Sequence, residues 1–151
     1  LNGGGSSSVV DPIFKLFVDG TLGKFVSRND SRALQVKADP IHNSQTVPII
    51  VIVSEDTVSY GEIFAGVLKD LGRTKVVGQT SLGNVEVLHG YNFDDNSQVW
   101  IASETFYSAT SETNFELSGI IPDVEAFAEW DTITFETDPS IKAALGLLGH
   151  Q

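Results

Sequence analysis

Residues 47–83 contain the pattern that most constrains the fold: a buried strand, a turn, a helix and a second strand. The first strand is predicted at residues 47–53 (VPIIVIV), which are apolar and rich in β-branched side chains. After a polar turn, apolar residues recur at the spacing of one helix face, at Ile63, Phe64, Val67, Leu68 and Leu71. Gly72 is expected to end the helix, because glycine readily adopts positive φ, and residues 75–78 form the second strand. The pattern predicts an α/β fold.

Ser59 stands where the turn meets the helix in this pattern. The first N–H groups of a helix have no partner within the helix, and the helix dipole adds partial positive charge there. A serine hydroxyl at this point would have the N–H of Tyr60 beside it to stabilise an oxyanion. The alternative is that Ser59 only caps the helix, since serine is a favoured N-cap residue.

The same stretch resembles the catalytic segment of the tail-specific (C-terminal processing) serine peptidases. Residues 57–66 (TVSYGEIFAG), 70–78 (DLGRTKVVG) and 81–84 (SLGN) match that family's segments S-A-S-A-S-E-I-F-A-G, D-x-G-R-A-x-V-V-G and T-F-G-K-G in order. Residues 1–5 (LNGGG) resemble the end of its L-R-x-N-G-G-G motif, and residues 115–124 (FELSGIIPDV) resemble its x-E-G-x-G-I-x-P-D-V motif. The resemblance implies that Ser59 is the nucleophile. It also implies a spiral of β-β-α units, as in Clp-type peptidases and crotonases.

The glycine run at the start of the chain has two interpretations. It is either a flexible start or a loop whose backbone N–H groups, from Gly4 or Gly5, complete an oxyanion hole with Tyr60. The resemblance favours the loop. It also implies that residues 1–151 are a single domain, the carboxy-terminal part of a larger catalytic core that is incomplete at the amino end and has no PDZ domain here. Such a chain is expected to form homo-oligomers or to associate with the missing part of the core.

The general base is the main open question, because a serine hydroxyl is a weak nucleophile without one. Asn84 stands where many members of the family have a catalytic lysine, and an amide cannot accept the proton. One explanation is the Ser-His-Glu arrangement of the tricorn-like branch, with Glu116 orienting a histidine from outside this chain. A second is that His89 is the base, and a third is that the chain only binds peptides or acts as a scaffold.

Other polar residues have simpler interpretations. Glu62 lies in the first helical turn, where the dipole favours a carboxylate, although it could line the site. His42 is expected in a solvated loop, and His150 is expected to be solvated at the end of the chain.

Composition excludes several classes of function. The net charge of −11 and a pI near 4.4 argue against nucleic acid and anionic membranes as partners. No apolar run approaches the roughly 20 residues that span a bilayer. The chain has no cysteine, and no metal site or cofactor is expected. The family resemblance implies a polypeptide substrate as the partner and suggests an exported or cell-envelope protein.

The remaining elements are predicted from local patterns. A helix at residues 8–18 is expected to have Ser8 as its cap and Pro12 in its first turn. Strands are predicted at residues 23–27, 33–37, 84–93, 98–109 and, from a weaker pattern, 123–130. A last helix is predicted at residues 141–148, with its start at residues 138–140 and its end at Gly149.

Overall fold

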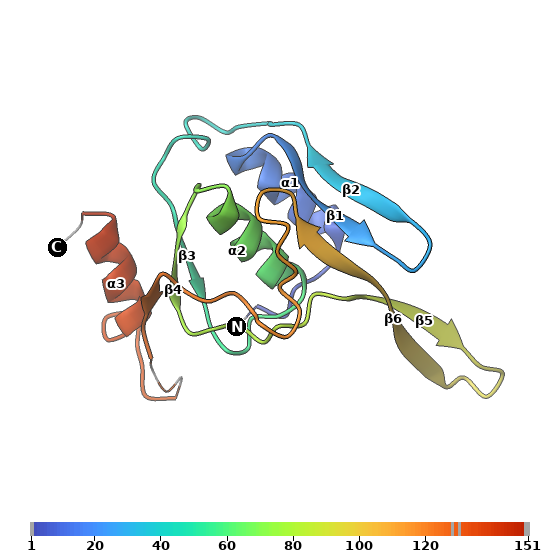
Figure 1. Ribbon diagram of the computed structural model, residues 1–151. Helices are drawn as coiled ribbons and strands as arrows, with labels where there is room; N and C mark the ends of the chain where they lie inside the picture. The colour runs from blue at the N-terminus through green and yellow to red at the C-terminus, as the bar shows by residue number, and fades with distance from the viewer. Residues whose placement is uncertain (1, 128, 130, 150–151) are drawn as a thin grey trace.

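The computed structural model describes residues 2–127, 129 and 131–149. Its elements are three helices and seven strands, shown in Figure 1. In chain order they are α1 (Ser7–Phe17), β1 (Gly20–Val26), β2 (Ser31–Val36), β3 (Ile50–Val53), α2 (Tyr60–Asp70), β4 (Lys75–Gly78), β5 (Val87–Asn92), β6 (Gln98–Ser108), β7 (Val124–Glu125) and α3 (Pro139–Leu147). Among these described residues, no helix has the length and apolar character needed to cross a bilayer.

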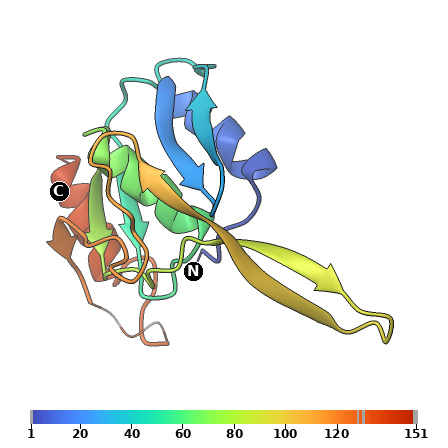
Figure 2. The ribbon, with the colours of Figure 1, turned by 45° about the vertical axis from the view of Figure 1, so that its right-hand side comes forward.

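The predicted strand–turn–helix–strand pattern forms the centre of the molecule. Strands β3 and β4 pair in parallel, with Ile50 opposite Lys75, and β7 joins the other side of β4. Helix α2 makes the connection between β3 and β4, and it ends before Gly72, whose φ is +66° as expected of a helix stop. Figures 1 and 2 show the parallel sheet between α2 on one face and α3 on the other.

A second sheet is antiparallel, with the strand order β2-β1-β6-β5. The β1–β2 and β5–β6 hairpins are both found where the sequence predicts them, although β5 starts three residues later, at Val87 instead of residue 84. Strand β6 is long: its second half pairs with β1 over the core, and its first half pairs with β5 in a hairpin that projects from the body of the molecule (Figure 2).

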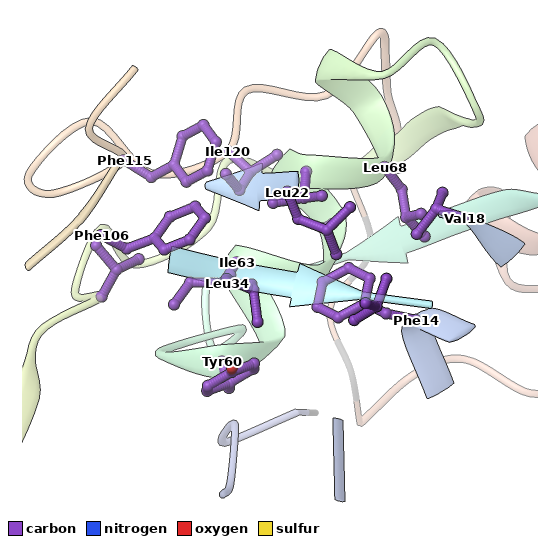
Figure 3. Packing of buried hydrophobic residues seen from close by; sticks show 14 of the residues in the cluster. Phe14, Val18, Leu22, Leu34, Tyr60, Ile63, Leu68, Phe106, Phe115 and Ile120 are labelled. Carbon is purple, nitrogen blue, oxygen red and sulfur yellow. The ribbon is translucent and has the colours of Figure 1, made fainter. Parts of the chain in front are cut away.

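The hydrophobic core lies between this antiparallel sheet and helices α1 and α2, as Figure 3 shows. The rings of Phe14 and Phe64 join the two helices at a centroid distance of 5.0 Å, and those of Phe25 and Phe106 join β1 and β6 at 5.2 Å. Phe14, Phe25 and Phe106 are completely buried. Each buried side chain of this size contributes roughly 1.5–3 kcal/mol relative to exposure, so the core fixes the start of α2 against the sheet.

Two local predictions are wrong. Helix α1 begins at Ser7 with Ser6 as its N-cap, so Pro12 lies inside the helix and not in its first turn. The helix tolerates the lost N–H because packing of Phe14 in the core holds its second half in place. The predicted strand at 123–130 is reduced to Val124–Glu125, which pair in parallel with Val77 and Gly78 of β4. Asp123 and Ala126 each add one backbone hydrogen bond to β4, and residues 128 and 130 of the predicted range lie outside the described residues.

The helix at the carboxyl end is confirmed. The Asp138 side chain accepts hydrogen bonds from the N–H groups of Ser140 and Ile141, and Gly149 follows the helix with a φ of +79°.

Candidate active site

Ser59 occupies the N-cap position of α2 with an unusual backbone conformation. Its φ is +61° and its ψ is −129°, which costs a residue with a side chain about 1–3 kcal/mol. Two hydrogen bonds hold it there: its N–H donates to the Asn84 carbonyl at 2.8 Å and to Glu62 Oε2 at 3.1 Å. The side chain is half-buried. A strained, doubly anchored serine at a helix N-terminus is typical of a functional position.

Glu62 lies beneath Ser59 and joins α2 to residues 81–84. The Glu62 side chain is completely buried. Its Oε1 accepts from the Ser81 hydroxyl at 2.5 Å and from the Gly83 N–H at 2.6 Å, while its Oε2 accepts from the Asn84 N–H at 2.9 Å as well as from Ser59. With both oxygens engaged by donors, Glu62 acts here as an anchor that fixes Asn84 beside Ser59. The geometry does not favour it as a proton acceptor.

The glycine loop passes directly over the start of α2. Gly4 has a φ of +80°, and a Cβ built on it would lie 2.7 Å from the Ser59 Cβ and 2.9 Å from the Tyr60 nitrogen. Only glycine can therefore leave the Tyr60 N–H uncovered here. That N–H has no hydrogen-bond partner among the residues that the structure describes.

The Gly4 N–H is not available as an oxyanion donor, because it donates to Asn2 Oδ1 at 3.0 Å. Gly5 is the remaining candidate, since its N–H has no partner within the described residues. Asn2 is a residue that sequence reasoning missed, although it stands in the quoted glycine motif. Its carbonyl also accepts from the Val58 N–H at 3.0 Å, so Asn2 ties the loop to the segment before Ser59.

A groove of about 700 Å³ opens beside Ser59. Its lining comes from the glycine loop and the start of α1, from the turn before α2, and from the segment that follows Asn84 into the β5–β6 hairpin. Phe25, Ile63 and Val85 form an apolar floor and are all buried. Of the described lining residues, none is a lysine or a histidine.

Two charged residues line this groove, Arg32 and Glu86. The Arg32 guanidinium forms a two-nitrogen ion pair with Glu104, with a shortest distance of 2.6 Å, and lies 4.0 Å from the centroid of the Phe25 ring. The hydrogen bond with Glu104 raises the pKa of Arg32. The Arg32 charge is thus compensated within the protein, and the Glu86 carboxylate remains at the groove.

The structure brings Glu116 close to the site but not His89. Glu116 Oε2 accepts from the Val85 N–H at 2.9 Å, one residue after Asn84, and Oε1 has no hydrogen-bond partner in the described part of the chain. His89 is exposed on β5, where its ring contacts Tyr91 edge-on at a centroid distance of 4.8 Å. His42 lies in an exposed loop, and His150 lies outside the described residues.

The motif at residues 115–124 supports the site from below. The Ser81 hydroxyl accepts from the Ile120 N–H at 2.7 Å, and the Leu117 N–H donates to the Gly83 carbonyl at 2.8 Å. Asp123 accepts from the Val76 N–H at 2.8 Å at the edge of β4. Burial alone would raise the pKa of Asp123, but this hydrogen bond and the two nearby lysine side chains outweigh it, and the pKa is lowered. Apart from Glu116, these contacts of the motif stabilise the segments around Ser59.

These features define the class of protein: a Clp/crotonase-like α/β fold with a strained serine at a helix N-terminus, the Tyr60 N–H without a partner among the described residues, and an open groove. The sequence profile of Peptidase family S41 matches residues 1–126. The chain belongs to this family of C-terminal-processing serine peptidases, which confirms both the resemblance and the predicted fold class.

Proteins that are similar to this chain are named as CtpA-like or C-terminal-processing proteases. A CtpA-like serine protease of Staphylococcus aureus is 25% identical over 167 aligned residues, which cover 99% of this chain and 33% of that protein. The chloroplastic carboxyl-terminal-processing peptidase 3 of Arabidopsis thaliana is 28% identical over 102 residues, covering 67% of this chain and 20% of the relative. The solved photosystem II D1 C-terminal processing protease superposes with a TM-score of 0.73 at 25% identity, covering 96% and 36%. The chain thus spans about a third of the length of the S. aureus relative.

Proposed function

We propose that this protein is a serine endopeptidase in which Ser59 is the nucleophile and the N–H groups of Tyr60 and Gly5 form the oxyanion hole. The observation that carries the proposal is the backbone of Ser59, held at a φ of +61° at the N-terminus of α2 with Gly4 packed against it. A capping serine needs no such conformation, since N-cap residues normally have β-region φ and ψ.

The chemistry follows from this arrangement. The Ser59 Oγ forms a bond to the peptide carbonyl carbon while its proton passes to a base, and the carbonyl oxygen takes the negative charge between the two N–H groups. The base then gives the proton to the leaving nitrogen as the C–N bond breaks. Water hydrolyses the resulting acyl-enzyme by the same steps in reverse order.

We propose that the base is a histidine oriented by Glu116. Support comes from Glu116 Oε1, which has no hydrogen-bond partner among the described residues, and from the groove, where the described lining has neither lysine nor histidine. The 151-residue chain by itself is accordingly expected to turn over peptides very slowly. Its oxyanion donors alone would leave catalysis on the order of 10³-fold over water.

Polypeptides are the proposed substrates, and we propose that the chain associates, either with a second copy or with the polypeptide that supplies the base. Solution light scattering over a range of protein concentrations tests this association. A constant mass of 16.3 kDa would count against association with a second copy.

A fluorophosphonate probe tests the nucleophile directly. We expect labelling at Ser59 in the active assembly, meaning this chain together with the polypeptide that supplies the base. Labelling should be lost in Ser59→Ala and retained in Ser54→Ala, which changes a serine of the neighbouring turn.

The pH dependence of turnover tests the base. Activity that rises with pH through about 6.5 would indicate an imidazole base. Glu116→Gln should lower turnover by up to roughly 10⁴-fold, whereas His89→Gln should have little effect. The opposite result for these two variants would make His89 the base.

A second function is favoured by one observation, Asn84 at the position of the family's lysine. It is peptide binding without hydrolysis. If the assembly of this chain with the polypeptide that supplies the base binds peptides but is not labelled at Ser59, this second function is supported and the endopeptidase is refuted.

A further inference from the structure

The β5–β6 hairpin exposes large apolar side chains on both of its faces. Its register pairs Gly90 with Trp100 and Leu88 with Ala102, so these four residues share one face, while His89 and Ile101 belong to the other. Trp100 is 60% exposed and Leu88 is 51% exposed. Both line the groove that contains Ser59. One face of the projecting hairpin is thus continuous with the candidate active site.

The indole of Trp100 lies with a ring face over Gly90. A Cβ built on Gly90 would be 3.0 Å from Cη2, 3.0 Å from Cζ3 and 3.1 Å from Cε3 of the Trp100 ring. Three consecutive ring atoms can be equally distant only from a point above the ring, because a point beyond the ring edge lies nearest to one of them. One face of the indole therefore rests on the β5 backbone, and the exposure of the residue leaves the other face open.

Strand β5 also has a free edge beside the groove. It is the outermost strand of the antiparallel sheet, and its only described neighbour is β6. Just before it, the N–H and carbonyl of Glu86 have no hydrogen-bond partner within the described residues. Unpaired backbone groups of this kind are a template for an extended peptide.

The distance from Ser59 to the indole corresponds to a short peptide. The Asn84 carbonyl touches the Ser59 N–H, and the chain runs from Asn84 through Leu88 to Gly90, beneath Trp100. Six residues of extended chain span at most about 20 Å. A peptide that follows this segment from the scissile bond would place a side chain on the indole within about six residues of that bond.

We propose that Trp100, together with Leu88, is a specificity-determining subsite that binds an aromatic or long aliphatic side chain of an extended polypeptide, four to six residues from the bond cleaved at Ser59. The link to cleavage rests on the proposed function; the binding does not. An apolar occupant fits because the open face is an indole with a leucine beside it, and stacking on an aromatic ring adds to the gain from apolar burial.

The test is peptide binding to the whole 151-residue chain carrying Ser59→Ala, which removes any effect of turnover. The probes are decapeptides labelled with a fluorophore, each with one phenylalanine moved along a glycine–serine background. We expect one or two positions to bind tightest, and Trp100→Ala to weaken those peptides roughly tenfold, a factor that corresponds to about 1.4 kcal/mol. Trp100→Phe should restore most of the affinity, and circular dichroism would verify that each variant is folded.

Ile101→Ala is the matched control, because Ile101 is 52% exposed on the opposite face of the same hairpin. It should leave affinity unchanged. In a Trp130→Phe background, Trp100 is the one remaining tryptophan of the sequence, and its emission should shift to shorter wavelength on binding. Equal effects of Trp100→Ala and Ile101→Ala, or equal affinity when lysine replaces the phenylalanine, would overturn the proposal. Trp100-dependent binding without any cleavage by the active assembly would refute only the endopeptidase.

Discussion

Asn84→Lys should place a base beside Ser59, in a groove whose described lining has neither lysine nor histidine. The Asn84 carbonyl is 2.8 Å from the Ser59 nitrogen, so standard backbone dimensions place the two Cα atoms at most about 7 Å apart. A lysine side chain reaches roughly 6 Å from its Cα. The Asn84 side chain is exposed and lines the same groove as Ser59, so the substitution requires no repacking. Glu62 would still hold the backbone in place through the Asn84 N–H.

The expected gain follows from the usual contribution of a positioned base, about 10²–10⁴-fold. We expect the rate of fluorophosphonate labelling of the 151-residue chain to rise about 10²-fold, at the low end of this range. The amine accepts a proton only when it is neutral, so the rate should increase with pH. An ordinary lysine has a pKa of about 10.4; the apolar floor lowers that value, whereas the nearby Glu62 carboxylate raises it. The rise is therefore expected on the alkaline side of pH 7.

The assay compares three variants by mass spectrometry of the labelled chain. Asn84→Met, with an unbranched side chain and no amine, should react like the unchanged protein, and Asn84→Lys combined with Ser59→Ala should not react at that site. If Asn84→Lys is folded but labels no faster than Asn84→Met at pH 9, the hydroxyl of Ser59 does not face residue 84. The reasoning that a base at position 84 can reach the Ser59 hydroxyl would then be refuted.

Three further predictions concern the parts that hold the site together. Glu62→Gln should lower the free energy of unfolding in urea by about 2–4 kcal/mol, because a buried amide cannot accept from all four donors; an unchanged midpoint would contradict the anchoring role. Gly4→Ala should cost about 1–3 kcal/mol and slow labelling, whereas Gly3→Ala, with nothing within 4 Å of its Cβ, should be nearly neutral. Burial, and then the 2.9 Å hydrogen bond to Asp11, raise the pKa of Tyr60. Its contribution is therefore complete below pH 10 and is lost as pH rises above 10, and Tyr60→Phe should make alkaline unfolding less steep.

The sequence by itself determined the elements whose signals are local. The β3–α2–β4 unit follows from an apolar run, a helix-spaced face and a glycine stop at Gly72, all of which depend on neighbours along the chain. Strand β4 has the predicted bounds, Lys75–Gly78. The family also follows from the sequence, because its motifs are short stretches of adjacent residues. Ser59 was found as a candidate for the same reason.

Only the tertiary structure decided how these stretches meet. From the sequence, the Glu62 carboxylate was expected to interact with the helix dipole, yet it accepts hydrogen bonds from residues 81–84. The Gly4 N–H was expected to bind an oxyanion, yet it donates to the Asn2 side chain. In the sequence, Trp100 is one residue of a predicted strand. In the structure, it lies over Gly90 and lines the groove that contains Ser59. The physical reason is that these contacts join groups that are distant along the chain. Local periodicity does not encode such pairings, and the packing of the core brings the groups together.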